Sequence, residues 1–223
     1  MFNPLGAGVR WAAFLGEVGL VETVLILGPG QRGLASVIAA RARGAGTIIV
    51  TGLGKDAGKL ALARELGADH TINVEEEDVV KRVTEITDGA MADVVLELTP
   101  MAAQPITDAI EAVRHSGRIV LAGLKGNKSV TLVTDRLINK GLTVKGAFGV
   151  NAEAYIEAIR IIESGRFPLE KLSSGTFELA DTEAAIQSLA DGDAVHVCVC
   201  PDPARAAAPA VGAAGRTPEE RSA

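Results

Sequence analysis

A glycine-rich loop follows the first aliphatic run of the chain and is its clearest chemical motif. Gly28-Pro29-Gly30-Gln31-Arg32-Gly33 fits the spacing G-x-G-x-x-G. In such a loop Gly28 permits a tight turn, Gly30 lets a pyrophosphate approach the backbone, and Gly33 lets the helix pack against the strand. The helix that follows offers N–H groups and the positive end of its dipole to phosphates. Because the motif stands between a strand and a helix, it favours a dinucleotide site.

Two other interpretations of the glycine loop stay open. The loop could be a turn that serves packing only. A methyltransferase that uses S-adenosylmethionine also places a glycine loop after its first strand. Failure to bind either nicotinamide cofactor would favour the methyltransferase.

The end of the second predicted strand bears on the choice of dinucleotide. A carboxylate is expected about 20 residues after the glycine loop, where it binds the adenosine ribose. The sequence instead has Thr51-Gly52-Leu53-Gly54-Lys55. Lys55 could attract a 2′-phosphate, which gives a slight preference for NADP. Asp56 is the counter-argument, since the loop could bring it back to the ribose.

The histidines and cysteines predict no metal site. His196, Cys198 and Cys200 alternate with valines and share one face of a strand, which is a poor tetrahedral set. A disulfide between the two cysteines is geometrically poor. His70 opens a short strand and His115 closes a helix. Neither has a serine, cysteine or carboxylate at a spacing typical of a catalytic pair. Asp93 and Glu97 are expected to be structural or orienting, so we name no catalytic residue and no metal ligand.

Strands and helices alternate strictly over the first half of the chain. The patterns predict strands at 21–27, 47–51, 70–74, 93–98 and 118–122, and helices through Leu34–Ile38, 57–66, Val79–Ile86 and 103–114. This alternation indicates an α/β fold with a parallel, doubly wound sheet. Beyond Gly123 the patterns predict helices near 132–139, Tyr155–Ile162 and 182–190, and strands at 142–147, 175–179 and 195–200.

Composition narrows the functional class. The net charge is −6 without a basic tract, so we expect no nucleic-acid and no membrane partner. No signal peptide is recognised at the start, which predicts a cytoplasmic protein. The last 23 residues, from Pro201, are rich in alanine and proline and are expected to be disordered.

Several segments in order resemble the cofactor domain of medium-chain, zinc-type alcohol dehydrogenases. They are Val24–Gly30, Leu62–His70, Ala92–Glu97, Gly117–Gly123 and Leu142–Gly149. The resemblance runs from about Asn3 to Pro201. It implies a Rossmann-type domain at 21–165, preceded by a linker helix in 1–20 and followed by a remnant of the catalytic domain at 166–200 and the tail at 201–223.

The resemblance also implies which residues contact NAD or NADP. Gly28, Gly30, Gln31, Arg32 and Gly33 would lie against the pyrophosphate, and Thr51, Gly52 and Lys55 near the adenosine ribose. Thr99, Ala122, Gly123 and Leu124 would line the path to the nicotinamide, with Ala147 and Phe148 near its end. The strand at 142–147 often forms the dimer edge in this family, so a homodimer is expected.

The resemblance has one main departure. In the family a GroES-like domain that carries the zinc ligands precedes the cofactor domain, and here Met1-Phe2-Asn3-Pro4 resembles the junction between them. A natural truncation, a split gene product and a misplaced start codon all stay open. The expected function is NAD(P)-dependent oxidation of a small alcohol or reduction of a carbonyl, with a non-catalytic dinucleotide module or a partner for a separately encoded GroES-like domain as the alternative. Residues 175–200 are expected to expose apolar surface.

Overall fold

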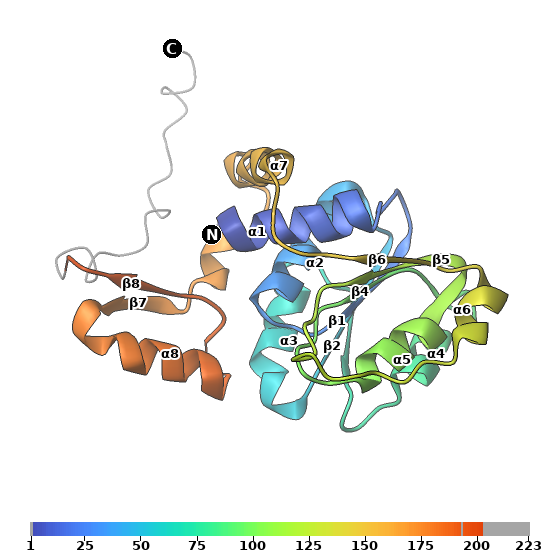
Figure 1. Ribbon diagram of the computed structural model, residues 1–223. Coiled ribbons are helices and arrows are strands. Elements are labelled where there is room, and N and C mark those ends of the chain that lie inside the picture. The colour runs from blue at the N-terminus through green and yellow to red at the C-terminus, as the bar shows by residue number, and fades with distance from the viewer. Residues whose placement is uncertain (1, 193, 203–223) are drawn as a thin grey trace, which may run out of the picture. The chain divides into compact units, whose positions relative to one another are not determined.

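A computed structural model describes residues 2–192 and 194–202 (Figure 1). The chain divides into two compact units, Met1–Phe167 and Pro168–Ala223. Of the tail predicted to be disordered, only residues 201 and 202 are described; residues 203–223 lie outside the described residues.

The first unit is built on a six-stranded parallel sheet. Its strands are β1 (Thr23–Leu27), β2 (Thr47–Gly52), β3 (His70–Asn73), β4 (Ala92–Glu97), β5 (Val113–Leu121) and β6 (Thr143–Gly146). They lie in the order β3-β2-β1-β4-β5-β6, with every neighbouring pair parallel. The strand order reverses at β1 and β4, and crossovers that run both ways from a central strand make the doubly wound α/β fold that was predicted.

Helices cover both faces of this sheet because its strands are aliphatic on both faces. The helices of the unit are α1 (Phe2–Gly8), α2 (Gln31–Arg43), α3 (Ala57–Glu65), α4 (Val79–Ile86), α5 (Gln104–Ala112), α6 (Thr134–Lys140) and α7 (Ala152–Glu163), with the π-helix η1 (Val9–Leu15) and the 3-10 turn η2 (Gly54–Asp56). Leu25 and Leu27 of β1 pack with Val83 of α4 and Ile110 of α5 in one core cluster. Figure 1 shows α4 and α5 on this face, with α1 and α2 on the other.

One predicted boundary is wrong. The helix expected to run to residue 114 ends at Ala112, and Val113 already pairs with Ala92 at the start of β5. A register shift then brings Arg118 opposite Val94. The backbone pairing of Val113, a β-branched residue, outcompetes the last helical turn. His115 therefore lies exposed in a strand and does not close a helix.

The second unit is small. It contains η3 (Leu169–Leu172), β7 (Gly175–Glu178), η4 (Leu179–Asp181), α8 (Thr182–Asp191) and β8 (Val197–Cys200), and β7 pairs with β8 in a separate parallel sheet. Four large apolar side chains among its described residues are exposed, namely Leu179, Ile186, Leu189 and Val199. No helix among the described residues is long and apolar enough to cross a membrane.

Candidate functional site

The glycine loop joins the end of β1 to the start of α2, at the carboxyl edge of the sheet. Gly28 has a φ of +108°, a conformation that favours glycine, and its N–H donates to the Thr51 carbonyl at 3.2 Å. A Cβ on Gly33 would lie 2.0 Å from the Gly28 carbonyl oxygen, so only glycine fits there. A Cβ on Gly30 would meet nothing within 4 Å. Gly28 and Gly33 are thus required by the fold, whereas Gly30 keeps open a space beside the backbone.

The first turn of α2 has neither a side-chain cap nor an acidic residue. Its N-cap residue is Gly30, which supplies no side-chain cap. The positive end of the helix dipole is therefore not neutralised by the helix's own side chains.

A hollow of about 420 Å³ opens on the β2 side of the loop. We call it the carboxylate hollow, because four acidic residues and no lysine or arginine line it. Its walls come from the ends of β1 and β2, from the loops that follow β1, β2, β3 and β4, and from α4 and α5. The lining residues are Leu27, Gly28, Pro29, Thr51, Gly52, Leu53, Asp56, Val74, Glu77, Asp78, Val79, Thr99, Ala102, Gln104, Pro105 and Asp108.

Asp56 is the carboxylate nearest the end of β2. One of its oxygens accepts from the Leu53 N–H at 3.2 Å, and the other pairs with Lys59 at 3.1 Å. A Cβ added to Gly52 would lie 3.3 Å from the Asp56 Cβ, so the two residues are close neighbours. Lys55 is exposed and lies outside the lining of the hollow.

Asp108 and Asp78 lie on the opposite wall, on α5 and at the N-cap of α4. Asp78 accepts from the Lys81 N–H at 2.7 Å, as an N-cap residue does. Partial burial raises the pKa of Asp108, the Gln104 amide works against that rise, and the charge of Asp78 adds to it.

A second hollow of about 290 Å³ lies at the N-terminus of α2. We call it the glycine-loop hollow. It is lined by Trp11, Gly28, Gly30, Gln31, Arg32, Gly33, Leu98 and Ala122. No aspartate or glutamate is in this lining. Gly28 belongs to both hollows, so they meet at the loop.

A buried ion pair braces the loops that divide the two hollows. Glu97, at the end of β4, is fully buried, and its Oε1 accepts from the Thr99 N–H and from Lys125 Nζ, each at 2.9 Å. Lys125 also donates to the Thr99 carbonyl. The Ala122 N–H donates to the Glu97 carbonyl at 2.9 Å. Glu97 thus holds the loops after β4 and β5 together through Thr99 and Lys125.

The structure brings nine of the fourteen predicted cofactor residues to the two hollows. They are Gly28, Gly30, Gln31, Arg32, Gly33, Thr51, Gly52, Thr99 and Ala122. The other five predicted residues line neither hollow, and they are Lys55, Gly123, Leu124, Ala147 and Phe148. The side chain of Phe148 is 85% exposed. A Cβ on Gly123 would lie 2.4 Å from the Thr99 carbonyl, so Gly123 serves the close packing of two loops.

Sequence reasoning missed Trp11, Glu77, Asp78 and Asp108. Glu77 and Asp78 directly precede α4 in a connection that follows β3, so the rule that ligands bind at the carboxyl edge of a parallel sheet could have found them. Asp108 lies within α5, and that rule does not single it out. Trp11 precedes the first strand, and no local pattern connects it with the glycine loop.

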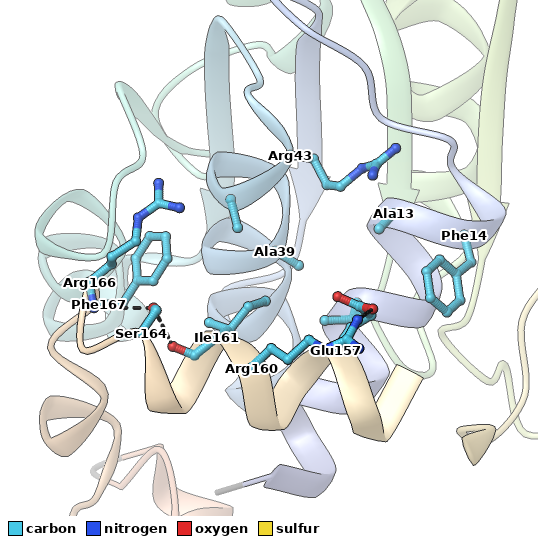
Figure 2. A pocket seen from close by; sticks show the side chains of 12 residues that line it. Ala13, Phe14, Ala39, Arg43, Glu157, Arg160, Ile161, Ser164, Arg166 and Phe167 are labelled. Atoms are coloured by element: carbon cyan, nitrogen blue, oxygen red, sulfur yellow. Dashed lines mark hydrogen bonds and ion pairs between the residues drawn. The ribbon is translucent and has the colours of Figure 1, made fainter. Parts of the chain in front are cut away.

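A third hollow, of about 430 Å³, lies among α2, α7 and η1 (Figure 2). Its lining includes Phe14, Arg43 and Phe167, and Figure 2 shows the ion pair between Glu157 and Arg160 within α7. It contains none of the predicted cofactor residues, and we assign it no role in cofactor binding.

The described residues do not fit a zinc ion. No group of three or more His, Cys, Asp or Glu side chains in residues 2–192 and 194–202 is placed to hold a metal. Cys198 Sγ lies 3.8 Å from His196 Nε2, without a third ligand. Both cysteines are free.

The strand order and the glycine loop define a Rossmann-type α/β protein. The family model described as "Zinc-binding dehydrogenase" matches residues 33–164, which is more than half of the chain. The chain therefore belongs to the zinc-binding dehydrogenase family.

Known proteins agree with this assignment. "Probable alcohol dehydrogenase adh" of Mycobacterium tuberculosis is 41% identical over 193 residues, which are 85% of this chain and 52% of that protein. "D-arabitol-phosphate dehydrogenase" of Enterococcus avium is 30% identical over 91% of this chain and 57% of its own length. The crystal structure of an alcohol dehydrogenase from Thermotoga maritima matches with a TM-score of 0.81 and 26% identity, over 90% of this chain and 55% of that one. The chain spans about half the length of the relatives it matches.

Proposed function

We propose that this chain binds NAD(H) and prefers it to NADP(H). The carboxylate hollow carries this proposal. Thr51 and Gly52 at the end of β2 border a cavity that Asp56, Glu77, Asp78 and Asp108 line. Carboxylates accept hydrogen bonds from the two ribose hydroxyls of NAD, whereas they repel the 2′-phosphate of NADP.

This proposal replaces the slight preference for NADP that the sequence suggested. That preference rested on Lys55, which is exposed and does not line the hollow. In this proposal Asp56 is the acid that binds the ribose, although it comes four residues after Gly52 and not at the end of the strand. Its pairing with Lys59 leaves the hollow net negative, since three further carboxylates line it.

In this proposal the pyrophosphate lies in the glycine-loop hollow. Gly30 leaves space beside the backbone, and the N-terminus of α2 and Arg32 supply positive charge there. The nicotinamide then extends past Ala122, on the side of the loops that Glu97 and Lys125 hold together.

We further propose that the chain is the cofactor-binding half of an alcohol dehydrogenase-like oxidoreductase. The bound dinucleotide supplies or accepts the hydride. The chain's own residues hold and orient the cofactor, while the group that polarises the oxygen of an alcohol or carbonyl substrate comes from a GroES-like domain outside this chain. The match to about half of each relative supports this division.

A homodimer through β6 completes the proposal. β6 is an edge strand of the sheet, and Val144 on it is 43% exposed. Ile138 on α6 and Phe148 beyond β6 are exposed nearby in the chain. An open edge strand with apolar neighbours is a surface that a second copy can cover.

Calorimetric titration of the purified chain with NADH, NADPH and S-adenosylmethionine tests the proposed cofactor. We expect NADH to bind more tightly than NADPH. Asp56→Asn should weaken NADH binding by roughly tenfold, as expected for a lost charged hydrogen bond, and should improve NADPH binding because it removes a repelling charge. Lys55→Ala is the matched control and should change neither affinity.

Three outcomes would contradict the proposal. Tighter binding of NADPH that is lost in Lys55→Ala would restore the preference for NADP. Binding of S-adenosylmethionine alone would indicate a methyltransferase. Absence of binding by all three would show that the chain does not form a nucleotide site by itself.

A further inference from the structure

Trp11 lies beside the glycine loop although it precedes the first strand. It is the only tryptophan of the chain, and it lies in the π-helix η1. Only 5% of its surface is exposed, and it lines the glycine-loop hollow with Arg32. The Arg32 guanidinium lies over its ring, with Cζ 5.7 Å from the ring centroid. This distance is that of a cation–π contact.

The packing of α1 on α2 places these two residues together. Gly8 lies so close to α2 that a Cβ there would be 2.5 Å from the Ala35 carbonyl oxygen. Trp11 follows Gly8 by three residues, and Arg32 precedes Ala35 by three. The tight crossing of the two helices therefore sets the indole against the first turn of α2 (Figure 1).

The π-helix keeps the indole in this position. The Gly16 N–H donates to the Trp11 carbonyl at 2.8 Å, across the wide turn of a π-helix. A Cβ on Gly16 would lie 2.9 Å from the same carbonyl, so the end of η1 is also closely packed. Short π-helical segments occur often at functional sites.

Nothing acidic competes for Arg32. The lining of the glycine-loop hollow has no carboxylate, and Arg32 forms no ion pair within residues 2–192 and 194–202. Trp11 Nε1 is buried and has no hydrogen-bond partner in the same part of the chain. A buried donor without a partner costs free energy in the unliganded protein. Within the described residues, Arg32 therefore has no carboxylate partner to leave before it pairs with an anion.

We propose that Trp11 is a positioning residue that holds the Arg32 guanidinium at the glycine loop for the pyrophosphate of the dinucleotide. This inference rests on the proposed function and extends it to a residue outside the glycine motif. An exposed arginine loses about 2 kcal/mol of side-chain entropy when it is fixed. Stacking on a buried indole restricts Arg32 before the ligand arrives, so less of that entropy is lost on binding.

A double-mutant cycle on the full chain tests this role, with ADP-ribose as the ligand. Arg32→Ala and Trp11→Leu should each weaken binding of ADP-ribose by about fivefold, the size of a partly desolvated cation–π contact. The double variant should bind no more weakly than Arg32→Ala alone, because Trp11 acts through Arg32. Trp11→Phe keeps an aromatic face and should restore most of the affinity. If Trp11→Leu unfolds, Trp11→Met, which also lacks an aromatic face, replaces it in the cycle.

Two results of the cycle would overturn the proposal. One is a loss of ADP-ribose affinity in the double variant equal to the product of the two single losses, and the other is unchanged affinity in Trp11→Leu.

The fluorescence of the single tryptophan supplies a readout without ligand. Arg32→Ala should change the Trp11 emission if the guanidinium stacks on the ring, and unchanged emission would contradict the stacking. If the unsubstituted chain binds neither NADH nor ADP-ribose, the proposed function fails, and the role of Trp11 in pyrophosphate binding fails with it. If it binds both and the cycle shows no coupling, only the role of Trp11 fails.

Discussion

The two hollows that meet at Gly28 differ in charge. The carboxylate hollow has four acidic residues and no lysine or arginine in its lining, whereas the glycine-loop hollow has an arginine, a helix N-terminus and no acid. NAD has a ribose at each end of its pyrophosphate, and the proposed function assigns the adenosine ribose to the carboxylate hollow. In that proposal each hollow receives a different part of one ligand.

The largest expected effect comes from substitution of the glycines in the loop. It should abolish binding at the glycine-loop hollow and leave the carboxylate hollow intact. In Gly30→Ala the new Cβ meets nothing within 4 Å, so the melting temperature should stay unchanged while NADH affinity falls by roughly 100-fold, about 2.8 kcal/mol. In Gly33→Ala the Cβ would lie 2.0 Å from the Gly28 carbonyl, so stability and binding should fall together.

Calorimetry and thermal melts on the two glycine variants separate these effects. Equal affinity of Gly30→Ala and the unsubstituted chain would show that no ligand approaches the backbone at this point. Gly146→Ala is a suitable control, because its Cβ also meets nothing and it lies outside both hollows.

The wall between the two hollows should be the next most sensitive element. Lys125→Met leaves Glu97 charged and fully buried without its cation. Loss of one partner of a buried pair costs about 3–5 kcal/mol, so the melting temperature should fall by roughly 10 °C. The double variant Glu97→Gln/Lys125→Met should recover much of this loss, since the amide oxygen still accepts from Thr99. Equal melting temperatures of the single and the double variant would show that the unpaired charge of Glu97 does not cause the loss of stability.

The acidity of the carboxylate hollow gives the smallest expected effect. Because partial burial and the charge of Asp78 raise the pKa of Asp108 above its ordinary value of 3.8, the folded chain holds this proton more tightly than the unfolded chain. The free energy of unfolding therefore falls as the pH rises from 3.8 through the raised pKa, and the loss persists above it. Asp108 is half-buried and solvent screens its repulsion, so Asp108→Asn should raise the melting temperature at pH 7 by only about 1–2 °C.

Melting curves at several pH values check this prediction. The gap between Asp108→Asn and the unsubstituted chain should close below pH 3.8. A gap of the same size at every pH would assign the effect to packing and not to charge.

The sheet and the glycine loop could be predicted because their signals are local. Runs such as Val24–Leu27 and Thr47–Val50 are aliphatic because helices cover both faces of the strands, and the glycine spacing reports one turn. The start of β5 could not be predicted. Whether Val113 ends a helix or begins a strand is decided by Ala92, a partner 21 residues away.

The candidate site was predicted only in part for the same reason. The motif identified Gly28, Gly30, Gln31, Arg32 and Gly33, but Trp11 was missed. Asp78 at the N-cap of α4 and Asp108 on α5 line the carboxylate hollow, and no motif connects them. The sequence-based preference for NADP depended on whether Lys55 or Asp56 faces the end of β2, and the direction of a short turn decides this. In η2 the Asp56 side chain accepts from the Leu53 N–H, which turns the carboxylate inward, while Lys55 faces solvent.

The central place of β1 in the sheet has a consequence for synthesis of the chain. β1 is made before the other five strands of its sheet, and it pairs with β2 on one side and β4 on the other. The Thr23 N–H donates to the Asp93 carboxylate across 70 positions of sequence. At about 5–20 residues per second a ribosome needs several seconds to make that span. During this interval one edge of the most apolar strand has no partner, so the nascent chain is most prone to aggregate before residue 97 has emerged.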